Sequence, residues 1–176
     1  MIFPCCCSLE ECSLSSGKIL VADDHSDYLL KFVGDVRLNL CASLNRYMQA
    51  LFKKDSVNRV VIDMLDAEGV DSTTLGLVAK MGLYCRRHYQ INVQLFCDNP
   101  SILRTLSCMG LDEIIDVLDR QLDTDLGNCL QESIDPDAAV DEIRQHVLEA
   151  HRVLRQINPD GGDEFADLIS ALELES

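Results

Sequence analysis

The sequence predicts an α/β fold: a mixed β-sheet with packed helices, followed by a C-terminal helical extension. Short β-branched runs alternate with stretches of helical spacing, which is typical of one sheet covered by helices. The acidic residues are unevenly spread, because residues 1–118 carry a formal charge of −4 and residues 119–176 carry −11 of the total of −15. We therefore expect an N-terminal tail at 1–16, a domain at 17–118, an acidic linker at 119–137 and a helical extension at 138–176.

Two strands are expected at the start of the domain, at 18–23 (KILVAD) and 28–33 (YLLKFV). The polar residues between them predict a hairpin connection, and Gly34-Asp35 predicts a turn that ends the second strand. A helix is expected at 40–52, because its apolar residues fall on one face. These residues are Leu40, Leu44, Met48 and Leu51.

The second half of the domain is expected to alternate strand and helix. The β-branched run 60–65 (VVIDML) predicts a buried central strand, and further strands are expected at 93–97 and 114–118. One helix should run from Asp71 to about Tyr89, and a shorter one at 101–109 should begin after Pro100 and end at Gly110. The inward stripe of the longer helix is Leu75, Val78, Gly82 and Cys85.

The extension carries an amphipathic helix over residues 140–157, with apolar positions at alternating three- and four-residue steps. These positions are Val140, Ile143, Val147, Ala150, Leu154 and Ile157. We expect Glu149 and His151 on its solvated flank. Two interpretations remain open: the helix folds back on the domain, or Val140–Ile157 is a seam for self-association or partner docking. A final short helix should present Phe165, Leu168, Ile169 and Leu172 on one face.

Composition argues against several classes of protein. A charge of −15 disfavours binding to nucleic acid or to anionic membranes, because both require a positive surface. We expect no signal peptide. We also expect no membrane span, because no apolar run approaches the roughly 20 residues that a span needs. The histidines are scattered and no phosphate loop occurs, so we expect no enzyme, cofactor or metal. The histidines are His25, His88, His146 and His151.

Eight of the nine cysteines fall into two groups. Four lie in apolar helix or strand patterns and are expected to be buried free thiols in a reducing cytoplasm: Cys41, Cys85, Cys97 and Cys108. Four others lie in the N-terminal tail without the spacing of a zinc site: Cys5, Cys6, Cys7 and Cys12.

The densest local signal is the segment 60–77 (VVIDMLDAEGVDSTTLGL), where a buried strand leads into a helix. Asp71 and Ser72 are suited to cap that helix, because their side-chain oxygens accept hydrogen bonds from its free amides. A hydroxyl at the same place is also favourable for phosphate, since the amides and the helix dipole attract an anion. Capping alone is the simpler interpretation.

The segment resembles the STAS domain of bacterial anti-sigma factor antagonists, whose pattern is a VVIDL-type strand followed by D-S-[ST]-G-L-G at the start of a helix. Here the matching residues are VVID at 60–63 and DSTTLG at 71–76. Gly34-Asp35, the strand at 92–96 and LSCMGL at 106–111 also match, so the resemblance covers about residues 18–118. Thr74 stands where the family usually has glycine.

The resemblance implies a cytoplasmic bacterial binding module in a partner-switching pathway of transcription regulation. Its acceptor would be Ser72, phosphorylated by a serine kinase that is often the anti-sigma factor itself and dephosphorylated by a PP2C-type phosphatase. Thr73 is an alternative acceptor, and Asp71, Ser72, Thr73, Thr74 and Leu75 would form the partner-binding surface. Phosphate adds about −1.5 to −2 charges, which would disturb an apposed interface next to Asp71.

A two-component receiver-like signalling domain is the alternative. Asp63 would then be the phosphoacceptor, and Asp23 and Asp24 would form the acidic pair that holds magnesium. Against this, residues 28–33 look like a strand where a receiver turns helical. In addition, no lysine follows Lys80, so the late-strand lysine of receivers has no counterpart.

Overall fold

The computed structural model describes residues 17–118, 132–134 and 140–158, together with residues 166, 169, 170 and 173. For 132–134 and 140–143 only the backbone is described. The expected N-terminal tail with Cys5, Cys6, Cys7 and Cys12 lies outside the described residues. So do Phe165, Leu168 and Leu172 of the expected final helix.

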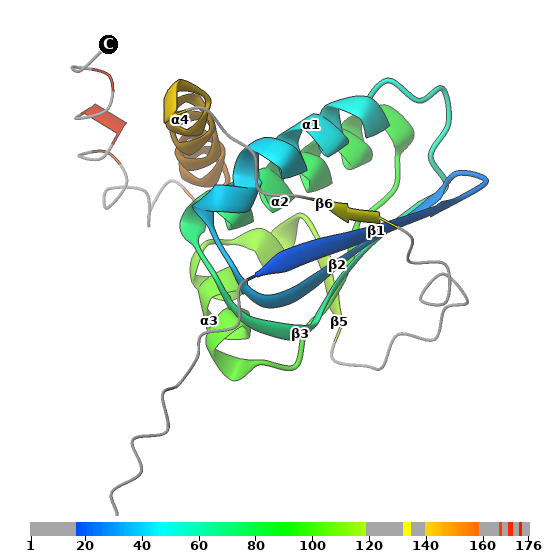
Figure 1. Ribbon diagram of the computed structural model, residues 1–176, viewed down its shortest axis with the longest axis horizontal. Helices are drawn as coiled ribbons and strands as arrows, with labels where there is room; N and C mark the ends of the chain where they lie inside the picture. Colours follow the sequence, from blue (N-terminus) through cyan, green and yellow to red (C-terminus); the bar gives the residue numbers. More distant parts are fainter. Residues whose placement is uncertain are drawn as a thin grey trace, which may run out of the picture.

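A mixed six-stranded sheet in the order β5-β4-β3-β2-β1-β6 forms the centre of the described fold (Figure 1). Strands β2 to β5 are parallel neighbours, whereas β1 is antiparallel to both β2 and β6. The strands are β1 (Lys18–Asp24), β2 (Asp27–Val36), β3 (Arg59–Val70), β4 (Gln94–Phe96), β5 (Asp116–Leu118) and β6 (Glu132–Ile134). The predicted fold class, a mixed sheet with packed helices, is confirmed.

Four α-helices accompany the sheet in the described part of the chain: α1 (Cys41–Leu51), α2 (Ser72–Tyr84), α3 (Pro100–Cys108) and α4 (Val140–Ile157). Helices α1, α2 and α3 pack on one face of the sheet, where they share a core with Val60, Ile62 and Met64 of β3. Successive strand residues point to opposite faces. Val61 therefore lies on the other face, in a smaller cluster with Leu29 and Phe96.

The β1–β2 hairpin forms where the polar connection predicts it. Its last paired residues are Asp24 and Asp27, and both residues between them, His25 and Ser26, have positive φ angles of 55° and 134°. The expectation that Gly34-Asp35 ends β2 is wrong, because the strand continues to Val36. Gly34 instead adopts a φ of 70° where the register of β2 against β3 shifts, as in a β-bulge.

The central strand β3 is longer than the apolar run at 60–65 predicts. Its second half pairs with the end of β2, up to Val70 opposite Val36. The chain therefore passes from the sheet directly into Asp71 and α2 without an intervening loop. This continuity fixes the start of α2 rigidly at the end of the central strand.

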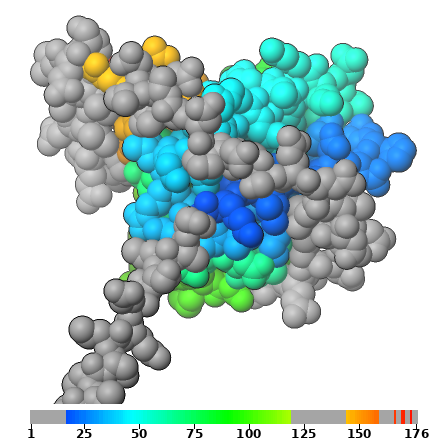
Figure 2. All heavy atoms as spheres, viewed as in Figure 1, coloured from blue at the N-terminus to red at the C-terminus, as the bar shows by residue number. Residues whose placement is uncertain are grey.

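The extension folds back on the domain. Helix α4 spans the residues predicted for it and packs against α2 and α1 (Figure 1). In the space-filling view α1 forms a large part of the visible surface, and α4 shows only in part beside it (Figure 2). Within the stretch expected as a linker, Glu132–Ile134 forms β6 on the edge of β1.

Candidate functional site

Asp71 organises the start of α2. It has extended backbone angles, and its Oδ1 accepts a hydrogen bond from the Thr74 amide at 2.8 Å, so it is the N-cap of the helix. Its Oδ2 accepts a second bond from the Leu38 amide at 2.7 Å. Asp71 thereby joins the segment before α1 to the start of α2, and its role in the structure is at least that of a double cap.

Ser72 is the first residue of α2 and is half-buried. Its Oγ lies 2.9 Å from Nε2 of His151 in α4, and the His151 side chain is 2% exposed. Nδ1 of His151 lies 2.7 Å from the carbonyl oxygen of Val147, which can only accept, so Nδ1 carries a proton. In the neutral form of the ring, Nε2 is then an acceptor for the Ser72 hydroxyl.

The neighbours of Ser72 point inward. Thr73 is 5% exposed, Thr74 is 1% exposed and Leu75 is fully buried. The Thr74 hydroxyl lies 3.5 Å from the Cys41 thiol in the core. In this conformation Asp71 and Ser72 are the residues of the predicted partner-binding set that are partly exposed.

Helix α4 packs on the first half of α2 so closely that the backbones of the two helices nearly touch. A Cβ placed on Gly76 would lie 2.5 Å from the Ala150 Cβ and 2.6 Å from its carbonyl oxygen. One turn further along α2, Lys80 pairs with Glu149 of α4 at 2.8 Å and donates to Asn45 of α1 at 3.2 Å. Glycine at 76 is therefore what allows the two helices to touch.

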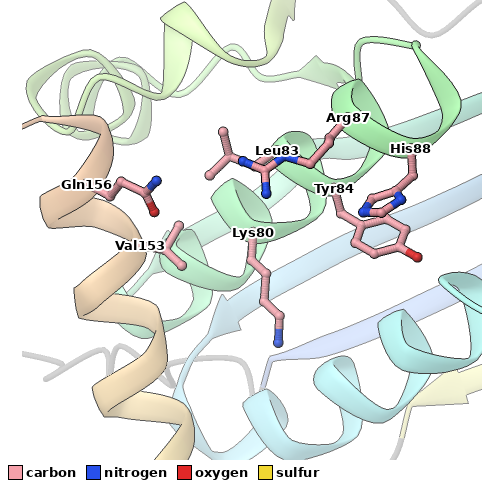
Figure 3. A pocket seen from close by; sticks show the side chains of 7 residues that line it. All are labelled: Lys80, Leu83, Tyr84, Arg87, His88, Val153 and Gln156. Carbon is pink, nitrogen blue, oxygen red and sulfur yellow. The ribbon is translucent and has the colours of Figure 1, made fainter.

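Beyond this contact the two helices enclose a hollow of about 190 Å³. Lys80, Tyr84, Arg87 and His88 line it from α2 and from the π-helical segment Cys85–Tyr89 that continues it, and Val153 and Gln156 face them from α4 (Figure 3). The His88 ring stacks on Tyr84 at a centroid distance of 4.1 Å. The interface between α2 and α4 is thus closed at Ser72 and Gly76 and open towards the C-terminal end of α2.

His151 is the site residue that the sequence analysis missed, because the expected place on a solvated flank is wrong. The seam chosen from sequence included Val147, Ala150 and Leu154. A stripe one residue wider also includes His151, four residues after Val147 and three before Leu154. The helix turns that wider face to α2, because His151 and Ala150 both touch it.

A serine hydroxyl that donates to a histidine is also the first half of a nucleophile–base pair. Here the ring is oriented by a backbone carbonyl of its own helix. Its 2% exposure leaves no room for a substrate at Nε2. The contact therefore serves helix packing and not hydrolysis.

Asp63 is a structural residue of the sheet. Its side chain is 4% exposed, its Oδ2 accepts from Lys31 at 3.2 Å, and its Oδ1 accepts from the Leu65 amide at 3.0 Å. Burial lowers the pKa of Lys31, but hydrogen bonds and Coulomb attraction from Asp66 and Asp63 outweigh it and raise that pKa. The Asp63 carboxylate is therefore paired with a lysine that stays charged.

The acidic pair of a receiver is not assembled around Asp63. Asp63 is opposite Lys31 in the sheet, which is opposite Leu20 of β1, whereas Asp23 lies three residues further along β1. At about 3.3 Å per residue this offset separates Asp23 from the level of Asp63 by roughly 10 Å. The receiver-like alternative is not favoured.

The cysteines of the domain are mostly buried, as expected. Cys41, Cys85 and Cys97 are buried free thiols, but Cys108 is exposed, because the last turn of α3 turns it to solvent. Burial raises the pKa of the Cys41 and Cys85 thiols to about 12. Among the described residues, no three histidine, cysteine, aspartate or glutamate side chains are grouped to hold a metal ion.

Comparison with known proteins agrees with this architecture. The family model of the STAS domain matches residues 19–129. The chain belongs to the STAS domain family. The match starts two residues after the predicted start of the domain at residue 17 and extends past its predicted end at residue 118.

A solved structure supports the STAS fold. An anti-sigma factor antagonist from Mycobacterium paratuberculosis superimposes with a TM-score of 0.52 and 19% identity, over 66% of this chain and 96% of that one. A sequence comparison with curated proteins finds no match. Among the described helices, none combines the length and apolarity needed to cross a membrane.

Proposed function

We propose that this STAS domain is a binding module of the anti-sigma factor antagonist type, controlled by phosphorylation of Ser72. The observation that carries the proposal is the position of Ser72 at the first turn of α2, directly after the central strand. Its backbone is held there by the Asp71 cap, and Ser72 is half-buried whereas Thr73 is buried. Ser72 is therefore a better acceptor than Thr73.

Phosphate at Ser72 would act on the partner interface and leave the fold of residues 17–118 intact. The first turn of α2 has free amides that favour an anion, so the domain tolerates the added charge. A partner covering the same turn would meet about −1.5 to −2 charges next to Asp71. An acidic partner would be repelled, and any partner would have to remove water from the phosphate at a cost in free energy. The module would bind its partner in the unphosphorylated form.

The partner in this proposal is a bacterial serine kinase or anti-sigma factor in the cytoplasm, and a PP2C-type phosphatase restores the free serine. In this proposal the domain performs no catalysis, because the Ser72–His151 contact has no room for a substrate. Partner switching would then release a sigma factor or another regulator. Nucleic acid is not expected as a ligand at a charge of −15.

A binding comparison tests the proposal. Tagged wild type and Ser72→Asp are used to capture partners from native cells, and captured proteins and phosphopeptides are identified by mass spectrometry. Ser101→Asp is the matched control, because Ser101 is exposed in the first turn of α3 and the change adds the same charge. We expect wild type and Ser101→Asp to retain a kinase or anti-sigma factor that Ser72→Asp loses. Equal capture by all three would contradict the proposal.

A further inference from the structure

Helix α4 covers one stripe of α2 that includes Ser72. Ser72, Gly76 and Lys80 are four residues apart and therefore lie on one face of the helix. Each of them is contacted by α4: Ser72 by His151, Gly76 by Ala150 and Lys80 by Glu149. We call these three positions the α2 stripe.

We propose that α4 is an internal occupant of the partner-binding surface, so that Ser72 becomes accessible only when α4 leaves the α2 stripe. The inference rests on the proposed function, in which the partner and its kinase act at Ser72. It goes further by assigning a competitor for that surface, namely the chain's own C-terminal helix.

The geometry leaves no space for a second occupant. At Gly76 the two backbones are so close that even one Cβ would meet Ala150 atoms at 2.5–2.7 Å. At Ser72 the hydroxyl is already used as a donor to His151 at 2.9 Å. A partner or a kinase active site that reaches Ser72 must therefore displace this part of α4.

The attachment of α4 runs from the His146–Asn45 contact at 3.4 Å to the hydrogen bond that Asn158 donates to the Cys108 carbonyl at 2.7 Å, but few of its side chains are fully buried. Ala150, His151 and Leu154 are buried, whereas Val153 and Ile157 are partly exposed. The hollow between Lys80, Arg87 and Gln156 shows that the interface is not closely packed along its whole length. Most of the main core is built from residues of the segment 17–118, with Leu154 added by α4.

A phosphate on Ser72 is unfavourable for the docked helix. Phosphorylation replaces the hydroxyl proton that His151 accepts, and it introduces charge against a face that is nearly dry. Lys80, the cation of the α2 stripe, already pairs with Glu149. Phosphorylation of Ser72 should therefore weaken the docking of α4.

Thiol labelling of the full-length protein measures access to position 72 without any partner. Ser72→Cys is treated with iodoacetamide, alone and combined with Ala150→Leu, which cannot fit against Gly76. Gln145→Leu is the matched control, because Gln145 is exposed on α4. We expect Ala150→Leu to speed labelling of position 72 by about tenfold or more, and Gln145→Leu to leave it unchanged. Equally fast labelling in all backgrounds would overturn the inference.

Buried Cys85 in the same samples reports whether the domain remains folded. If Ala150→Leu also exposes Cys85, a second experiment tests the inference. It measures backbone hydrogen exchange in Ser72→Glu, with Ser101→Glu as the control. We expect Ser72→Glu to lower the amide protection of Val140–Ile157 while β3 stays protected. Unchanged or increased protection of α4 would refute the inference. Neither measurement involves a partner, so a failed partner capture would leave this result intact.

Discussion

The Ser72 hydroxyl donates a 2.9 Å hydrogen bond to Nε2 of His151, although the two residues are 79 positions apart. This bond links the start of α2 to the C-terminal extension. It joins the residue proposed as phosphoacceptor to a helix outside the region that the family resemblance covers.

The bond should be measurable as a coupling energy. Ser72→Ala and His151→Ala should each lower the free energy of unfolding, by about 1 and 2–3 kcal/mol respectively, because removal of the His151 ring also leaves a cavity. The double variant should lose about 1 kcal/mol less than the sum. Urea unfolding of the four proteins gives the cycle. The control pair is Ser72→Ala with Ser107→Ala, because Ser107 is an exposed serine on α3. The losses in free energy of unfolding from these two changes should add.

Gly76→Ala should destabilise the protein, contrary to the usual effect of this change in a helix. Alanine at a helical position normally gains up to about 1 kcal/mol over glycine. Here the added Cβ would meet Ala150, so the expected net loss in the free energy of unfolding is about 1–3 kcal/mol. In a chain ending at residue 139 the sign should reverse, because α4 is absent. Stabilisation of the full chain would contradict the close contact.

Lys31→Met should cost about 2 kcal/mol of stability, because it leaves the Asp63 carboxylate buried without its cation. The estimate is below that for a fully buried pair because the Lys31 side chain is 23% exposed. Lys31→Met with Asp63→Leu should recover most of the loss. Acetyl phosphate with magnesium should leave Asp63 unmodified, as phosphopeptide mapping can check. An acyl phosphate on Asp63 would revive the receiver-like alternative.

The cysteines should react with iodoacetamide in an order set by burial. Burial raises the pKa of Cys41 and Cys85 to about 12, which leaves on the order of one thiol in 10⁴ ionised at pH 8. Of the four cysteines that the structure describes, Cys108 is exposed and should be labelled first. Peptide mass spectrometry after timed labelling separates the sites. Denaturant should equalise the rates, and rapid labelling of Cys41 in the native protein would contradict its burial.

Truncation after residue 120 should leave a folded but less stable domain. The chain that remains contains β1 to β5 and the three helices on the sheet, but it loses β6 and the burial of Ala150 and Leu154. We expect cooperative unfolding at a lower denaturant midpoint. Loss of cooperativity would mean that α4 is an obligatory part of the core.

The sequence predicted most of the elements, because their signals are local. The β-branched run at 60–65 and the apolar face of α1 each follow a period that one element determines by itself. The end of β2 was misjudged because Gly34-Asp35 is a turn signal in isolation, whereas pairing with the end of β3 keeps the strand extended. β6 was missed because its pairing with β1 is set by tertiary contact and not by a period of its own.

The site was only half predictable for a similar reason. Asp71 and Ser72 are recognisable from the order of strand, acid and helix start. Their partner His151 is not, because nothing in the sequence relates α4 to α2 before the fold brings them together. The small residues Gly76 and Ala150 can be read from the sequence, but their role in close helix packing follows only from their contact in the fold.

The pairing of β6 with β1 has a consequence for the strength of any competitor. β6 ends at Ile134 and α4 begins at Val140, so the helix is held on a tether of five residues. A helix released on so short a tether remains at an effective concentration in the millimolar range around its own site. An outside ligand occupies the surface only when its own concentration exceeds a threshold. That threshold is the local concentration of α4 divided by the ratio of the ligand's affinity to that of α4. Lengthening the tether would therefore lower the threshold without altering a single contact.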